Sequence, residues 1–241
     1  MIPAGGLVVV PEGSSSCQCA YNYKMSLGLI SDDRLFHYGL GGTDRSGAPG
    51  LRINFGAPGD RADENGQIWY AYPRPVAYGR CLGSQPYGPK PAGPRLPIEE
   101  QNTEPSYQTW GRNPDWISIE DTDKPWLHAC GLEGSVHVVI RTPDELRTAD
   151  SLRVVLYFCE LDARASPKAF DIRLQDETVL RTFNVTEAAG GTRAAITRTF
   201  SIGNAESIRL ELAPNSSPPI ISGMAITAGS ASASATQDQY R

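Results

Sequence analysis

One stretch near the middle of the chain constrains the fold more than any other. Residues 152–159 (Leu-Arg-Val-Val-Leu-Tyr-Phe-Cys) place hydrophobic side chains on both sides of an extended strand, because alternate residues point to opposite faces. After a polar loop, residues 169–174 (Ala-Phe-Asp-Ile-Arg-Leu) alternate between hydrophobic and polar side chains. The first pattern indicates a central strand covered on both faces, and the second a strand with one buried and one solvated face. We therefore predict that two antiparallel strands form the middle of a β-sandwich.

Similar patterns recur along the chain and predict an all-β fold. Further strands are expected at residues 51–55, 67–72, 136–140, 178–185, 193–200, 207–212 and 220–227. Helical periodicity is not sustained anywhere, and 24 glycines and 19 prolines predict many turns. A set of about ten short strands separated by turns is typical of a sandwich or a jelly roll.

The 241 residues suffice for one large all-β domain with an appendage, or for two small domains. Residues 1–31 contain two strand-like stretches around a Ser-rich loop, which indicates an N-terminal β-hairpin segment that needs something to pack on. Residues 32–50 are polar and Gly-rich, as in a linker. We expect the sandwich to span residues 51–228, and residues 229–241 to form a disordered, low-complexity tail.

Charge and hydropathy restrict the possible partners and the location. A formal charge of −5 argues against a nucleic-acid partner, because phosphate binding requires a basic surface. No hydrophobic run approaches the roughly 20 residues of a membrane span. No basic segment precedes the short apolar run at residues 7–10, so no signal peptide is visible. The chain is therefore either cytosolic or a fragment whose export signal lies upstream.

Cysteine and histidine spacing indicates no metal site. The five cysteines are Cys17, Cys19, Cys81, Cys130 and Cys159, and their spacing fits neither a redox motif nor a zinc knuckle. A disulfide within the first segment or to Cys81 remains open, and Cys159 is interpreted as a small core residue. Residues 60–66 (Asp-Arg-Ala-Asp-Glu-Asn-Gly) predict a tight Asn-Gly turn, with a structural calcium near Asp60 and Asp63 as the alternative.

A cluster of aromatic residues is the candidate binding site. The candidate residues are Trp69, Tyr70, Tyr72, Tyr107, Trp110 and Trp116, with Arg112 and Asp115 as polar neighbours. The hydrophobic C–H face of a sugar stacks on such rings, and its hydroxyl groups bond to nearby charged or amide side chains. The alternative is that the rings pack in the core or hold the Pro-rich stretch 72–104, because large aromatic residues dominate burial energetics.

Catalysis receives little support from the residues. A glycosidase needs two carboxylates roughly 5 to 10 Å apart. Acidic residues are plentiful, and no pair is singled out among Glu120, Asp121, Asp123, Glu133 and Glu160. Nucleophile-elbow, zinc-protease and phosphate-loop motifs are absent from the sequence. No cofactor is expected.

Several motifs, taken in order, resemble the malectin-type domain family. They are residues 52–56 (Arg-Ile-Asn-Phe-Gly) with 63–69 (Asp-Glu-Asn-Gly-Gln-Ile-Trp), 154–160 (Val-Val-Leu-Tyr-Phe-Cys-Glu), 169–174 with 179–185, and 221–226 (Ile-Ser-Gly-Met-Ala-Ile). Cys159 stands where the family usually has Ala. The resemblance implies a jelly-roll β-sandwich of the malectin-like or galactose-binding-like kind, and carbohydrate binding.

The binding positions of malectin are not carried over to this chain. Malectin holds its sugar with aromatic residues that follow one strand, and with an Asp that precedes the last strand. In this chain, residues 154–160 resemble the first of these two strands. Here the first stretch reads Glu-Leu-Asp-Ala (160–163) and the second Asn-Ser-Ser-Pro-Pro (215–219), with neither an aromatic nor an Asp at the required place. A fold alone does not imply a function.

The N-terminal segment has a separate resemblance. Residues 3–11 (Pro-Ala-Gly-Gly-Leu-Val-Val-Val-Pro), 17–19 (Cys-Gln-Cys) and 27–30 (Leu-Gly-Leu-Ile) look like the last blade of a pyrroloquinoline-quinone-type β-propeller. This implies the C-terminal part of a larger secreted or periplasmic bacterial protein. We therefore expect a non-catalytic carbohydrate-binding accessory module. The alternatives are a structural module that docks on the propeller domain and a glycoside-processing enzyme.

Overall fold

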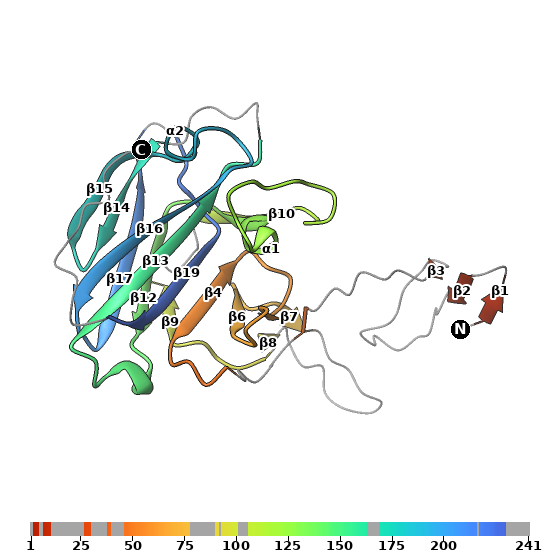
Figure 1. Ribbon diagram of the computed structural model, residues 1–241, viewed down its shortest axis with the longest axis horizontal. Helices are drawn as coiled ribbons and strands as arrows, with labels where there is room; N and C mark the ends of the chain where they lie inside the picture. The colour runs from red at the N-terminus through yellow and green to blue at the C-terminus, as the bar shows by residue number, and fades with distance from the viewer. Residues whose placement is uncertain are drawn as a thin grey trace.

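Two stacked β-sheets form the body of the fold in a computed structural model (Figure 1). The structure describes residues 2–4, 7–10, 27–29, 38–39, 46–77, 90–91, 93–100, 106–162, 169–215 and 217–229. One sheet has five strands in the order β15 (Glu177–Asn184), β14 (Ala169–Leu174), β17 (Ser207–Pro214), β12 (Val136–Arg141) and β9 (Ile98–Glu100). The other has six, in the order β16 (Ala195–Gly203), β13 (Ser151–Cys159), β19 (Gly223–Ala228), β4 (Leu51–Phe55), β6 (Ile68–Tyr72) and β5 (Arg61–Ala62). The predicted all-β sandwich is confirmed.

The main core lies between these sheets and comes from the hydrophobic positions of the alternating strands. Phe158 of β13 and Phe170 of β14 are fully buried, and their ring centroids are 6.2 Å apart. Phe183 of β15 completes the cluster, at 5.1 Å from Phe158 and 5.7 Å from Phe170. Such aromatic contacts add to the free energy gained by burying the rings.

The strand at residues 152–159 is covered on both faces, as predicted. Within β13, Phe158 points into the main core, whereas Val155 and Cys159 are buried on the opposite face. However, β13 and β14 do not pair with each other, because each belongs to a different sheet. β13 pairs with β16 and β19, and β14 pairs with β15 and β17. Among the pairs in the two large sheets, β4 with β6 is parallel.

Smaller elements surround the sandwich. A three-stranded sheet has the order β10 (Tyr107–Gly111), β11 (Cys130–Gly134) and β18 (Ile220–Ile221), and β7 (Val76–Ala77) pairs with β8 (Lys90–Pro91). The helices are α1 (Pro125–His128), α2 (Val185–Ala189) and a 3₁₀ turn at Asp144–Leu146. At the end of α2, Gly190 takes the positive φ of a helix C-cap.

The N-terminal strands form a sheet of their own. β1 (Ile2–Ala4), β2 (Leu7–Val10) and β3 (Leu27–Leu29) pair antiparallel in that order. β2 and β3 fall in the two stretches that the sequence marks as strands, and β1 adds a third. Cys17, Cys19 and Cys81 lie outside the described residues, as does most of the tail after Ala228.

Candidate functional site

The outer face of the six-stranded sheet carries a second hydrophobic layer. Residues 112–130, which contain α1, cross this face and bury Trp126 and Leu127 against Val155 of β13. The ring of Trp69 lies edge-on to Trp126 at 5.9 Å and to Tyr157 at 5.4 Å. Such edge-to-face contacts are a favourable aromatic geometry. The layer holds α1 and the loop before it against the sheet.

The turn at residues 63–66 positions Trp69. The Gly66 amide donates to the Asp63 carbonyl at 2.9 Å, and Gly66 has a φ of 77°, so the predicted tight turn is confirmed. The Asp63 carboxylate accepts hydrogen bonds from the amides of Asn65 and Gln67, each at 3.0 Å, and from the indole Nε1 of Trp69 at 3.2 Å. Asp63 therefore ties the turn to the aromatic layer.

Asp60 also has protein partners. Its carboxylate forms a buried ion pair with the guanidinium of Arg74 and accepts the Ala71 amide at 3.0 Å. Both carboxylates of the calcium alternative thus already accept hydrogen bonds, and their geometry gives that alternative no support. Among the described residues, no three His, Cys, Asp or Glu side chains come together as metal ligands.

Two of the candidate tyrosines bind one carboxylate. Tyr72 of β6 and Tyr107 of β10 both donate their phenol hydroxyls to Oε1 of Glu100, at 2.6 and 2.5 Å. Burial raises the pKa of both phenols, and the bond to Glu100 raises each further, so both stay protonated donors. This cluster joins β6 and β10 to β9, the edge strand of the five-stranded sheet.

The structure divides the predicted aromatic residues between core and surface. Trp69 and Tyr72 are buried, and Tyr70 and Tyr107 are half-buried against the main core. Trp110 is also half-buried, and its indole lies on Gly131, where a Cβ would stand 2.6 Å from the ring. The eight predicted site residues therefore do not form one binding surface.

Three of the eight residues remain exposed and lie within a single turn. Trp116 is 80% exposed, and Arg112 and Asp115 are exposed beside it in sequence. The turn is closed by a bond of 3.0 Å from the Trp116 amide to the Asn113 carbonyl, and the Asp115 amide donates to the Asn113 side chain at 3.0 Å. Its start is fixed by the Arg112 amide, which donates to the Ala129 carbonyl at 2.8 Å. We call residues 112–116 the Trp116 turn.

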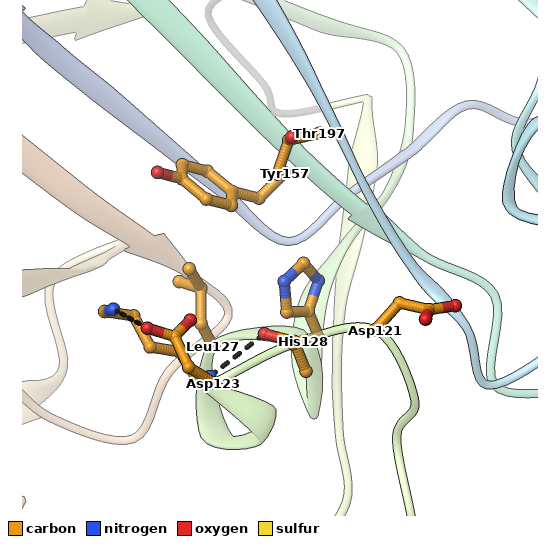
Figure 2. A pocket seen from close by; sticks show the side chains of 8 residues that line it. Asp121, Asp123, Leu127, His128, Tyr157 and Thr197 are labelled. Carbon is orange, nitrogen blue, oxygen red and sulfur yellow. Dashed lines mark hydrogen bonds and ion pairs between the residues drawn. The ribbon is translucent and has the colours of Figure 1, made fainter. Parts of the chain in front are cut away.

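A hollow of about 330 Å³ lies between the outer face of the six-stranded sheet and the loop before α1 (Figure 2). Its lining comes from Asp121, Thr122, Asp123 and Lys124 of the loop, Leu127 and His128 of α1, Tyr157 of β13 and Thr197 of β16. In Figure 2 the imidazole of His128 points toward Tyr157 and Thr197, and Asp121 and Asp123 flank it.

The charged groups of the hollow are partly paired. Lys124 Nζ lies 2.8 Å from Asp123 Oδ2, and this bond lowers the pKa of Asp123. The Lys124 amide donates to Thr122 Oγ1 at 3.0 Å. His128 is 2% exposed, and burial lowers its pKa to about 4, although the nearby Phe158 carbonyl and the charge of Asp123 favour protonation. The imidazole is therefore neutral at physiological pH.

Sequence reasoning did not find this hollow. Asp121 and Asp123 were noticed only as two of many acidic residues, and Tyr157 only as a residue covering a strand face. Lys124, His128 and Thr197 carried no signal at all. Their proximity depends on the packing of α1 against β13 and on the pairing of β13 with β16, and these elements lie far apart in the sequence.

Comparisons with known proteins support the fold. Residues 149–216 match the family model of the malectin domain. No curated protein sequence matches the chain. A β-glucuronidase of Bacteroides uniformis is similar in structure, with a TM-score of 0.53 and 16% identity over 76% of this chain and 18% of the enzyme.

Two plant receptor structures are similar as well. The ANX2 ectodomain of Arabidopsis thaliana has a TM-score of 0.50 and 15% identity, covering 73% of this chain and 48% of the ectodomain. The plant receptor-like kinase FER has a TM-score of 0.52 and 13% identity, covering 78% of this chain and 44% of that chain. The alignments thus span less than half of each of these longer chains. At these identities they show the fold, which is a malectin-like all-β sandwich. Among the described residues, no helix is long and hydrophobic enough to span a membrane.

Proposed function

We propose that this chain is a non-catalytic carbohydrate-binding module that holds its ligand on the Trp116 turn. The observation that carries the proposal is the 80% exposure of Trp116, a large aromatic side chain held on a hydrogen-bonded turn. Among the described residues, Trp116 is the only large hydrophobic side chain that is exposed. An exposed indole gains little burial energy from folding, and both faces of its ring are available to a ligand.

The neighbouring side chains suit a sugar. An indole face stacks on the C–H groups of a pyranose ring, and the Arg112 guanidinium and the Asp115 carboxylate supply a donor and an acceptor for hydroxyl groups. Both side chains are exposed on the same turn. The match of residues 149–216 to the malectin domain supports a carbohydrate ligand, because the best-known members of that family bind carbohydrate.

The electrostatics of Asp123 do not suit the general acid of a glycosidase. A glycosidase needs one carboxylic acid whose pKa is raised so that it can donate a proton to the leaving group. The bond from Lys124 instead lowers the pKa of Asp123, so this residue is a carboxylate at neutral pH. We assign no catalytic role to it.

We also propose that the module is one part of a longer protein. The solved structures resembling this chain are longer chains in which the sandwich is one part. We infer a module of a larger secreted or periplasmic bacterial protein, with residues 1–31 as the final strands of a propeller domain. A structural module that docks on the propeller is the competing function.

A glycan array probed with the whole chain tests the function. We expect Trp116→Ala to weaken binding to the recognised glycan at least about ten-fold, because one stacking platform is removed. Trp116→Phe retains a ring and should bind with intermediate strength. Ser118→Ala, an exposed neighbour on the same loop, is the matched control and should bind like the natural chain. Unchanged binding by Trp116→Ala, or a folded chain that binds no glycan, would contradict the proposal.

A further inference from the structure

The hollow is separate from the Trp116 turn in its lining, since no residue of 112–116 contributes to it. Its volume of about 330 Å³ lies at the lower end of small-molecule pockets and would hold roughly ten water molecules or one small ring. The walls come from the loop before α1, which supplies residues 121–124, and from α1, β13 and β16. The shape of the hollow therefore depends on how this loop and α1 lie against the six-stranded sheet.

One buried polar atom in the hollow has no hydrogen-bond partner among the described residues. His128 is 2% exposed, and its Nδ1 atom has no hydrogen-bond partner among the described residues. Its ring lies edge-on to Tyr157, with centroids 6.0 Å apart, and points into the hollow (Figure 2). An unsatisfied buried polar atom costs about 1–3 kcal/mol. A ligand with a hydroxyl group at this point would remove that cost.

The other lining groups define the chemistry of such a ligand. Tyr157 and Leu127 supply apolar surface, and Thr122, Thr197, Lys124 and the two aspartates supply donors and acceptors on several sides. Two carboxylates and one ammonium group give the lining a formal charge of −1, which disfavours an anion. The pairing of Lys124 with Asp123 leaves little unbalanced charge for a strong cation site.

We propose that the hollow binds one neutral, polyhydroxylated ring of monosaccharide size, with His128 at the bottom of the site. The ligand class rests on the proposed carbohydrate-binding function, whereas the location does not. One ring nitrogen of His128 is engaged with the Phe158 carbonyl, so the unpartnered Nδ1 of the neutral ring is the position that remains for a ligand hydroxyl group. The hollow and the Trp116 turn would then be two sites of one module.

Imidazole NMR of the whole chain tests this inference. The chain has three histidines, so selective ¹⁵N labelling gives few signals to assign. The probes are glucose, galactose and N-acetylglucosamine. Tetrahydropyran is the ring without hydroxyl groups, and glucuronate and glucosamine are the charged sugars. His137 lies on β12 in the opposite sheet and is an internal control.

A pair of variants on one strand separates binding in the hollow from general effects. Thr197→Trp places a large ring at the exposed rim of the hollow, on the edge strand β16. Thr199→Trp is two residues along the same strand and on the same face, is also exposed, and does not line the hollow. Both substitutions suit a strand, so both variants should fold.

We expect at least one neutral sugar to give a saturable shift of the His128 signals, with no shift of His137 and no response to tetrahydropyran. Thr197→Trp should weaken this response at least about ten-fold, and Thr199→Trp should not. Trp116→Ala should leave it unchanged. A silent His128 with all three neutral sugars, a response only to a charged sugar, or an equal response in Thr197→Trp would overturn the inference. If the glycan array still depends on Trp116, the proposed function stands without the second site.

Discussion

Trp116 and Trp126 lie ten residues apart in residues 112–130, the segment that covers the outer face of the six-stranded sheet and that we call the cover. One ring is exposed and the other is buried. Trp126 is 3% exposed, packs on Trp69, and has the Arg61 guanidinium 4.8 Å above its ring. Trp116 is 80% exposed on a turn. Burial of an aromatic ring stabilises the fold, and exposure leaves its face available to a ligand. Trp126 therefore stabilises the packing of the cover on the sheet, and Trp116 is free to contact a ligand.

Replacing Trp126 should have the largest effect on stability. Trp126→Ala removes a buried ring from the aromatic layer and should lower the free energy of unfolding by about 3–5 kcal/mol. Trp116→Ala is the matched variant. Urea denaturation followed by circular dichroism measures both. Equal losses in the two variants would break the distinction between the buried and the exposed ring.

The turn at residues 63–66 contributes to the burial of Trp126, because Asp63 holds the Trp69 ring against which Trp126 packs. Asp63→Ala removes the bonds to the Asn65 and Gln67 amides and leaves the Trp69 indole without an acceptor. We expect a loss of about 2–3 kcal/mol, since these bonds involve a charged acceptor. Glu64→Ala, an exposed neighbour, should change stability by less than about 0.5 kcal/mol.

The pH dependence of stability tests how tightly the cover is held over His128. The pKa of His128 is about 4 in the folded chain, below its ordinary value of 6.5, so protonation favours the unfolded chain. The stability is fully present above the unfolded pKa and is lost as the pH falls from 6.5 toward 4. Between pH 7 and pH 5 this amounts to about 2 kcal/mol.

Denaturation at a series of pH values, together with direct NMR titration of the ring, checks this prediction. Asp121, Asp123, Lys124 and Tyr157 face the same hollow. Asp123 has a lowered pKa, so it stays ionised through this window. His137→Gln should keep the pH dependence, and His128→Gln should flatten it. A folded-state pKa near 6.5 for His128 would show that the cover opens to water.

Replacing Trp116 should have the smallest effect on stability. Trp116→Ala should change the free energy of unfolding by less than about 0.5 kcal/mol, because the ring is largely in solvent. The same variant should lose glycan binding, so stability and binding respond to different tryptophans. A large loss of stability would mean that the exposed ring has a packing role.

Strand positions were predictable because each depends on a local pattern. The alternation in residues 169–174 reflects one buried and one wet face, and β14 has that pattern. The pairing of strands was less accessible. β13 and β14 follow each other in the chain, yet they lie in opposite sheets, because the hydrophobic faces of both pack across the core. The alternation of hydrophobic residues is the same whether two consecutive strands pair in one sheet or face each other across the core.

The candidate site was predicted only in part. Trp69 and Trp116 have similar aromatic character in sequence, and their difference arises from the Asp63 turn, which directs Trp69 inward. The hollow had no local signature, because His128, Tyr157 and Thr197 are separated by long stretches of chain. Tertiary packing brings them together, and no motif records it.

The all-β class, the approximate strand positions and the turn at residues 63–66 follow from the amino-acid sequence, because each depends on side-chain alternation or turn chemistry over a few residues. Which aromatic rings are buried and where α1 meets β13 follow from tertiary packing instead. Burial depends on what packs against a side chain, and those partners come from distant parts of the chain.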